Sequence, residues 1–270
     1  MAALVAAMCF YTSSLQAQEA GSDTVSRPVT SIFTLDMGRA DVLDTYLTPV
    51  TYHGPNLRLG YEAIQACGFN PGKWVRDLEV GVDYGNVKNP TGVNQMHSLM
   101  VEGRWSLERR WRDVLTPGLQ FTAGGMVQAR GGAIYNGHNS NNICSVKVHM
   151  ALGVAGTASY PLNLGRLPVT LNYRMTMPVI GACYSPEYDE SYYEIYVGNH
   201  SGLVHPAWWG NRFDIDNLVA ADLHLGHTTL RLGYRNHFTH TSIRNLTHRH
   251  QSHSLVLGIS TTIQTLSPRQ

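Results

Sequence analysis

The chain contains repeated segments, each about ten residues long, in which apolar and polar side chains alternate. In residues 101–111, one face carries valine, leucine and two tryptophans, whereas the other carries glutamate, arginine and serine. Residues 119–130, 169–177, 228–235 and 253–263 repeat the pattern. A strand turns successive side chains to opposite faces, and a membrane barrel turns one face to lipid and the other to its lumen. The alternation therefore predicts strands with two chemically different faces.

The spacing of the connections predicts how these strands are joined. Short turns are expected at 67–73, 113–118, 160–168 and 225–228, and longer loops at 38–55, 86–94, 131–142, 180–212 and 237–251. Outer-membrane barrels have short periplasmic turns and longer outer loops. We therefore predict an all-β, antiparallel, up-and-down transmembrane β-barrel of about ten strands, starting near residues 30, 57, 75, 96, 119, 143, 168, 213, 228 and 252. Twelve strands are the alternative, if part of 192–209 forms a further hairpin.

Composition agrees with one barrel domain. Charged residues make up only 14% of the chain, against about 25% in a typical soluble domain. After the N-terminal apolar stretch, no segment approaches the ~18 to 20 consecutive apolar residues of a membrane-spanning helix, so only a closed barrel could cross a bilayer. Residues 1–17 begin with an apolar stretch and continue with small polar residues, which is typical of a signal peptide. We expect 18–29 to form an N-terminal periplasmic segment and 30–266 the barrel.

Charge and cysteine content exclude several classes of protein. The formal net charge is +1 and no basic run is present, so a nucleic-acid partner is not expected. Three cysteines, Cys67, Cys144 and Cys183, follow the predicted signal peptide and are widely spaced. This pattern supports neither a disulfide framework nor a zinc knuckle, and we expect no cofactor.

The predicted inner face carries full charges of both signs. The residues expected to form a charge network in the lumen are Arg58, Glu62, Asp77, Glu79, Glu102, Arg104, Glu108, Lys147, Arg174, Arg231 and Arg235. Unpaired charges are costly once water is removed, so we expect these residues to form salt bridges that fill a narrow lumen. A filled lumen is not that of an open general porin. The alternative is a secreted β-sandwich, whose strands also alternate. Its solvated face would carry serine and threonine in place of so many charges.

Several short motifs resemble one known family. They are Leu43–Pro49 (LDTYLTP), Asn139–Asn142 (NSNN), Ser185–Tyr188 followed by Ser191–Ile195, and Thr228–Tyr234 (TTLRLGY). As a set they resemble a family of Bacteroidetes exported proteins of unknown function with outer-membrane β-barrel character, and the similarity extends from about Asp41 to Gly258. The resemblance implies a Bacteroidetes cell envelope and supplies no catalytic residues.

One motif suggests hydrolytic chemistry. His138 and Ser140 are two residues apart, so on an extended segment they point to the same side, as a base and its nucleophile must. The segment His138–Asn142 resembles the His-x-Ser-Asn motif of outer-membrane phospholipase A. The resemblance implies that His138 is the general base and Ser140 the nucleophile, with the orienting asparagine unidentified. The alternative is an asparagine-rich turn whose side chains bond the backbone.

Histidines are concentrated near the end of the chain. They are His224, His227, His237, His240, His248, His250 and His253. His248 and His250 could share one face of a strand and bind a transition metal or heme, since imidazole suits such ions. No carboxylate or cysteine follows at ligand spacing, so we predict a polar outer loop and no metal site.

Aromatic residues are concentrated in the predicted loop 184–209. Tyr192, Tyr193, Trp208 and Trp209 are the candidate binding residues of this loop. Aromatic rings of this kind form either an interfacial girdle with a loop over the barrel mouth, or a surface that binds glycan, lipid or a partner protein.

Taken together, the sequence predicts a monomeric outer-membrane barrel with a plugged lumen. We expect a structural, binding or envelope-assembly component, not an enzyme, with outer-membrane lipid, and an envelope protein or glycan, as its partners. Two alternatives remain open at this point. They are a phospholipase-like serine hydrolase acting through His138 and Ser140, and a narrow channel.

Overall fold

The computed structural model describes residues 24–139, 142–186, 198, 202–226, 228–263 and 266–268. The predicted signal peptide at 1–17 lies outside this set. All described elements are strands, and none of the described residues belongs to a helix long and apolar enough to cross a membrane. The chain divides into two units. One is Arg27–Thr265, and the other contains β1 (Thr24–Ser26), which pairs with β13 (Leu266–Pro268).

The larger unit is a single closed antiparallel sheet of ten strands. They are β2 (Val29–Asp44), β3 (Thr48–Ala66), β4 (Trp74–Lys88), β5 (Gln95–Arg112), β6 (Gln120–Tyr135), β7 (Cys144–Leu164), β8 (Leu167–Tyr184), β10 (Arg212–Leu225), β11 (Thr228–Ile243) and β12 (Leu246–Ile263). Neighbours in sequence pair with each other, β8 pairs with β10, and β12 pairs with β2 to close the barrel. The ten-strand prediction is confirmed, and the twelve-strand and sandwich alternatives are wrong. An additional strand, β9 (Val204–Trp208), pairs with the end of β8 and is not part of the closed circuit.

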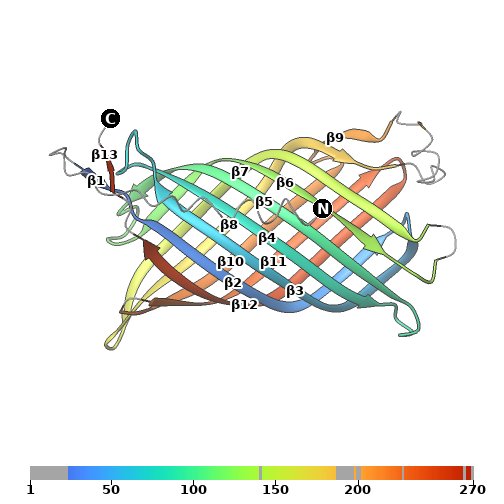
Figure 1. Cartoon of the computed structure of the whole chain (residues 1–270), viewed down its shortest axis with the longest axis horizontal. Coiled ribbons are helices and arrows are strands. Elements are labelled where there is room, and N and C mark those ends of the chain that lie inside the picture. Colours follow the sequence, from blue (N-terminus) through green and yellow to red (C-terminus); the bar gives the residue numbers. More distant parts are fainter. Residues whose placement is uncertain are drawn as a thin grey trace. The chain divides into compact units, whose positions relative to one another are not determined.

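The register of the strands tilts them around the barrel axis (Figure 1). A row of paired residues can be followed once around the barrel through Val146, Ala133, Leu99, Tyr84, Leu57, Met37, Leu255, Tyr234, Val219, Tyr173 and Ala158. The row returns to β7 at residue 158 after leaving it at 146, a displacement of 12 residues. Closure with such a stagger requires strands inclined by roughly 35–45° to the axis. Side chains from strands that are distant in sequence therefore meet inside the barrel.

The two faces of the wall have opposite chemistry. On β4, burial alternates residue by residue, and in its middle part, residues 77–84, the charged side chains are inside and the apolar ones outside. Arg58 and Glu79 are 4% and 3% exposed, whereas Leu152 and Leu255 are 58% and 66% exposed. A water-soluble barrel would bury the leucines and expose the charges. The inverted pattern is the one that a lipid environment requires.

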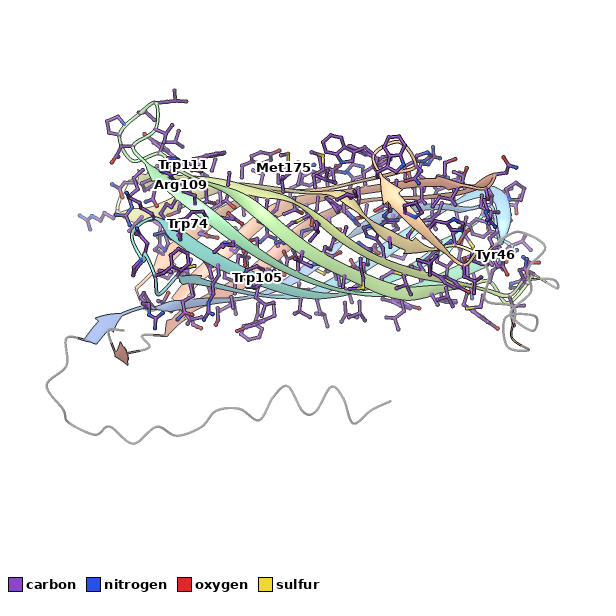
Figure 2. All side chains as sticks on the ribbon, turned by 90° about the horizontal axis from the view of Figure 1, so that it is seen from above. Tyr46, Trp74, Trp105, Arg109, Trp111 and Met175 are labelled. Atoms are coloured by element: carbon purple, nitrogen blue, oxygen red, sulfur yellow. The ribbon has the colours of Figure 1, made fainter. Side chains whose placement is uncertain are left out.

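Aromatic side chains lie near both ends of the apolar outer surface. Figure 2 places Trp74, Arg109 and Trp111 near one end, which carries the β3–β4, β5–β6, β7–β8 and β10–β11 connections and is called the base here. The Arg109 guanidinium lies 5.5 Å from the Trp111 ring. Toward the opposite end, the mouth, Tyr84 stacks on His97 and the Tyr84 hydroxyl lies 2.9 Å from His97 Nδ1. Rings with an apolar body and a polar tip suit the two membrane interfaces.

Two of the predicted long loops at the mouth are wrong. The strands β2 and β3 continue through 38–55 and meet at the three-residue turn Thr45–Leu47. Similarly, β11 and β12 continue through 237–251 and meet at Arg244 and Asn245, whose φ angles of 48° and 65° are those of a tight two-residue hairpin. The polar residues that suggested loops belong to strands whose outward side is no longer apolar.

Candidate functional site

A group of buried arginines converges on one glutamate in the middle of the lumen. Glu79 Oε1 accepts hydrogen bonds from Arg58 Nη2 at 3.0 Å and Arg235 Nη2 at 2.7 Å. Glu79 Oε2 accepts from Arg174 Nη2 at 2.7 Å and also from Arg104. These side chains come from β3, β4, β5, β8 and β11, so they connect opposite sides of the barrel wall. Charge-assisted bonds of this kind are stronger than neutral ones and fix the planar guanidinium groups in orientation.

Further carboxylates surround this centre. Glu62 binds Arg174 and lies 3.0 Å from Arg231 Nη1, and the Arg231 Nε donates to Asp222 at 2.7 Å. The four arginines that bind Glu79 form additional ion pairs with Asp36, Asp77, Asp83, Glu102 and Asp216. A further arginine, Arg130, pairs with Asp83 and Glu102. We call this connected set the lumen network. Because each buried charge has partners of opposite sign, the desolvation cost is offset within the network.

A glycine makes room for this arrangement. Gly81 lies between the inward residues Glu79 and Asp83 on β4. A Cβ atom at Gly81 would lie 2.4 Å from Cζ of Arg58, which is closer than real side chains approach. The absence of a side chain at Gly81 therefore allows the Arg58 guanidinium to lie against β4 and reach both carboxylates.

The lumen network contains nine of the eleven residues proposed from the sequence. The two others lie inside the barrel but elsewhere: Lys147 Nζ is 2.9 Å from Asp44 Oδ2 near the mouth, and Glu108 accepts hydrogen bonds from Ser106 and Thr122. Asp83, which the same alternation assigns to the inner face, also belongs to the network. The members that the sequence argument missed are Asp36, Arg130, Asp216 and Asp222. Their inward parity on the strands was the signal that could have identified them.

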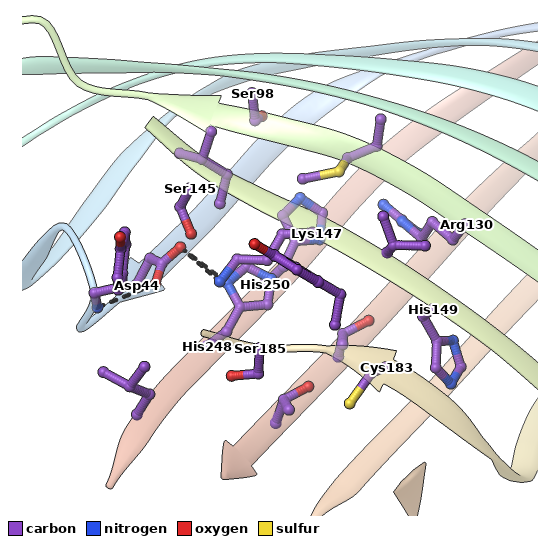
Figure 3. Close-up of a pocket in the computed structure, with 18 of the residues that line it drawn as sticks. Asp44, Ser98, Arg130, Ser145, Lys147, His149, Cys183, Ser185, His248 and His250 are labelled. Carbon is purple, nitrogen blue, oxygen red and sulfur yellow. Dashed lines mark hydrogen bonds and ion pairs between the residues drawn. The ribbon is translucent and has the colours of Figure 1, made fainter. Parts of the chain in front are cut away.

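A cavity lies between the lumen network and the mouth. It has a volume of about 60 Å³ and is lined by side chains from all ten strands of the closed sheet. Figure 3 shows Asp44 and Lys147 joined by an ion pair on one side of this mouth cavity, with His149, His248 and His250 around it. Asp44 Oδ1 also accepts a hydrogen bond from the backbone N–H of Tyr46 at 3.2 Å. The cavity therefore combines charged and imidazole side chains with apolar ones such as Met100 and Ile134.

Three imidazoles of this cavity have unused ring nitrogens. Within the described part of the chain, Nδ1 of His149, His248 and His250 is buried and makes no hydrogen bond, and that of His248 lies 4.0 Å from Asp44 Oδ2. Buried polar atoms without partners are uncommon and are often satisfied by water or a ligand. The described residues contain no group of histidine, cysteine and carboxylate ligands arranged to hold a metal ion. The free nitrogens therefore favour hydrogen bonding to a small polar molecule.

The β2–β3 turn closes part of the mouth. Tyr46 and Leu47 are buried inside the barrel, and Figure 2 places Tyr46 at the end opposite to Trp74 and Trp111. From the β6–β7 loop, Asn139 Nδ2 donates to the carbonyl of Leu47 at 2.6 Å and Asn142 Nδ2 donates to the carbonyl of Tyr46 at 3.5 Å. Two of the motifs that stood out in the sequence thus bind each other.

Replacing both asparagines with alanine is expected to destabilise the barrel. The double variant Asn139→Ala and Asn142→Ala removes two amide donors from turn carbonyls, at a cost of about 1 kcal/mol each. Urea unfolding in detergent, followed by circular dichroism, measures the change. His138→Ala in the same loop is the control, because the His138 side chain is exposed and only its backbone N–H bonds Asn136. Equal stability of the double variant and the control would contradict the role of the amides.

Of the other residues proposed from the sequence, the structure describes His138, Trp208 and Trp209. His138 is in the β6–β7 loop, and Ser140 lies outside the described residues, so the proposed His138–Ser140 pair stays a prediction. Tyr192 and Tyr193 also lie outside the described residues. Trp208 is 58% exposed at the end of β9, and Trp209 Nε1 donates to the carbonyl of Pro178 at 2.9 Å. Trp209 therefore binds the backbone of β8 at Pro178, a residue that has no N–H to donate to the backbone hydrogen bonds of the sheet.

A second cavity lies on the base side of the lumen network. Its volume is about 190 Å³, and its walls include Glu108, Arg110, Thr122, Ser159 and Asn172. Between the two cavities, the space beside Arg58 and Arg235 amounts to about 10 Å³. A gap of that size holds about one water molecule. The lumen network therefore separates a mouth cavity from a base cavity.

A family model described as "Protein of unknown function (DUF3316)" matches residues 3–270. The chain belongs to this family. The match covers nearly the whole chain and confirms that the sequence resembles a family of unknown function, whereas the Bacteroidetes source stays a prediction. A search among curated proteins found no match.

Among solved structures, similar chains are outer-membrane barrels. The outer membrane protease OmpT from Escherichia coli has a TM-score of 0.46 and 7% sequence identity, with 93% of this chain and 100% of that chain covered. The β domain of the Bordetella autotransporter BrkA has a TM-score of 0.41 and 10% identity, covering 88% and 100%. The outer membrane protein AlkL has a TM-score of 0.35 and 10% identity, covering 96% and 100%. The likeness is one of general barrel form.

Proposed function

We propose that this protein is a non-conducting β-barrel of the bacterial outer membrane, which serves the cell envelope as a structural or binding component. One observation carries the proposal: the lumen network around Glu79 fills the middle of the barrel and separates the mouth cavity from the base cavity. A lumen filled in this way is unsuited to the diffusion of solutes. The mouth cavity, with its free imidazole nitrogens, supports the binding of a small polar ligand from the outside.

The membrane placement is supported by the wall of the barrel. Its outward side chains are apolar in the central part, and aromatic rings lie near both ends. The ten strands contain 14 to 21 residues, whereas a tilted strand needs about 9–11 to cross a bilayer. The strands are thus long enough to extend beyond the lipid. On the mouth side, the exposed residues Lys88 and Arg249 suit such a water-facing extension.

Heat-modifiability of the outer-membrane fraction tests this placement. A closed barrel that resists detergent at room temperature is expected to migrate differently on a gel before and after boiling, and to keep its β circular dichroism in detergent. The expected result is a shift for protein recovered from the outer-membrane fraction. Recovery in the soluble fraction without any shift would contradict the proposal.

A narrow channel is the second candidate, because cavities lie on both sides of the lumen network. A channel would have to break several ion pairs of Glu79 in order to join them. Planar bilayers separate the two functions. A steady current through the unaltered protein would favour the channel, whereas silence combined with correct membrane insertion supports the non-conducting barrel.

A further inference from the structure

A groove on the outer surface of the barrel combines an apolar and a charged part. It has a volume of about 600 Å³ and lies across β11, β12, β2 and β3. Its lining consists of Met37, Gly38, Arg39, Asp41, His53, Tyr234, Gln251, His253, Ser254 and Leu255. The groove is separate from the lumen, since it is on the opposite face of the wall from Glu79.

The groove lies where the outer surface changes from apolar to polar. On β2 and β12, paired outward residues are first Met37 and Leu255 and then, toward the mouth, Arg39 and His253. Toward the base, the outward residues continue as Leu35 and Phe33 on β2 and as Leu257 and Ile259 on β12. In a membrane barrel this boundary is the level of the lipid headgroups. The position rests on the membrane placement proposed above.

Arg39 is the cation of this groove. Its side chain is exposed, and within the described part of the chain it makes no hydrogen bond or ion pair, whereas the arginines of the lumen network are all paired. The only acidic group in the groove, Asp41, has a partner of its own, because its Oδ1 lies 2.6 Å from His53 Nδ1. The Arg39 guanidinium is therefore available for an external anion.

The other polar walls of the groove are held in place. His253 contacts the Tyr234 hydroxyl, and its Nε2 lies 3.1 Å from Gln251 Nε2. The Tyr234 and His253 rings stack with centroids 6.1 Å apart. A rigid polar rim beside an unpaired guanidinium reduces the ordering cost of binding a headgroup.

We propose that this groove binds the phosphate-bearing headgroup of an outer-leaflet lipid, with Arg39 on the phosphate and an acyl chain lying along Met37 and Leu255. A guanidinium offers two parallel N–H donors that match phosphate oxygens. The apolar lower part of the groove is continuous with the lipid-facing wall, so an amphiphile fits both halves. Free phosphate would use only the charged half, which is open to solvent and screened.

The test measures lipid binding to the detergent-purified barrel by native mass spectrometry. The probes are lipid A carrying its phosphates, the same lipid after dephosphorylation, and inorganic phosphate. We expect phosphorylated lipid A to bind at least tenfold more tightly than either of the others. Arg39→Gln is expected to weaken its binding about tenfold, which corresponds to about 1.4 kcal/mol.

Arg166→Gln is the matched control. Arg166 is also exposed and unpaired among the described residues, but it lies in the β7–β8 turn at the base, so its replacement is expected to leave lipid binding unchanged. Equal binding by wild type and Arg39→Gln, or equal binding of the dephosphorylated lipid, would overturn the site. Gel shifts of the same samples show whether the barrel is folded. If the protein were recovered outside the outer-membrane fraction, the proposed function would be contradicted. The lipid-binding comparison between wild type and Arg39→Gln is measured on purified protein and would still stand or fall separately.

Discussion

Replacing Glu79 with glutamine is expected to lower the free energy of unfolding by about 3–5 kcal/mol, since it leaves buried cations without their shared counter-charge. Four guanidinium groups bond the Glu79 carboxylate, and this side chain is 3% exposed. Glutamine has nearly the same shape, so the packing of the lumen is preserved. The glutamine amide has one oxygen acceptor and no charge, so it cannot replace the two carboxylate oxygens that bind the four arginines. The arginines would then repel one another.

Urea unfolding of the purified protein in detergent measures this loss, with the temperature of the gel shift as a second readout. Glu108→Gln is the control. Glu108 is also buried in the lumen, but its partners are the hydroxyls of Ser106 and Thr122 and it forms no ion pair among the described residues. We expect the control to lose much less stability than Glu79→Gln. Equal losses would show that burial, and not convergence of the arginines, determines the effect.

The second large effect is expected in conductance. A triple variant, Arg58→Ser, Glu79→Ser and Arg235→Ser, is expected to convert a silent barrel into a conducting pore. Arg58 and Arg235 line the gap of about 10 Å³ that separates the two cavities, and both bond Glu79. Removing both signs of charge together limits the number of unpaired buried ions. Shorter side chains at these positions would join the mouth cavity to the base cavity through water.

Single-channel recording in planar bilayers measures this change. The carboxylates that remain around the gap, which include Asp36, Asp83 and Glu102, predict a preference for cations in the opened pore. The control is Glu108→Ser with Arg110→Ser, which enlarges only the base cavity and is expected to stay silent. Silence of a correctly inserted triple variant would show that another part of the chain blocks the lumen.

The sequence was sufficient to predict the barrel because period-two alternation is a local property. On β4, inward Asp77, Glu79 and Asp83 alternate with outward Leu78, Val80 and Val82, and this order alone assigns a polar lumen and a lipid-facing wall. The same reasoning failed at 38–55 and 237–251. There the outward residues are polar because the wall extends beyond the apolar belt, so the strands resembled loops.

The choice of partners inside the lumen could not be obtained in this way. Parity placed Glu79 and Arg235 on the inner face, but they are 156 residues apart and meet only because the strands are tilted and the sheet is closed. The same closure brings Asn139 to the carbonyl of Leu47 and so gives the asparagine motif a structural contact.

By itself, the sequence determined the number of strands, the two faces of the wall and the charged character of the lumen. The tertiary structure decided that four arginines share one glutamate, that the β2–β3 turn lies in the mouth, and that Arg39 stands unpaired in the described part of the outer wall. Strand faces follow from neighbouring residues, whereas these contacts depend on the 12-residue displacement with which the sheet closes on itself.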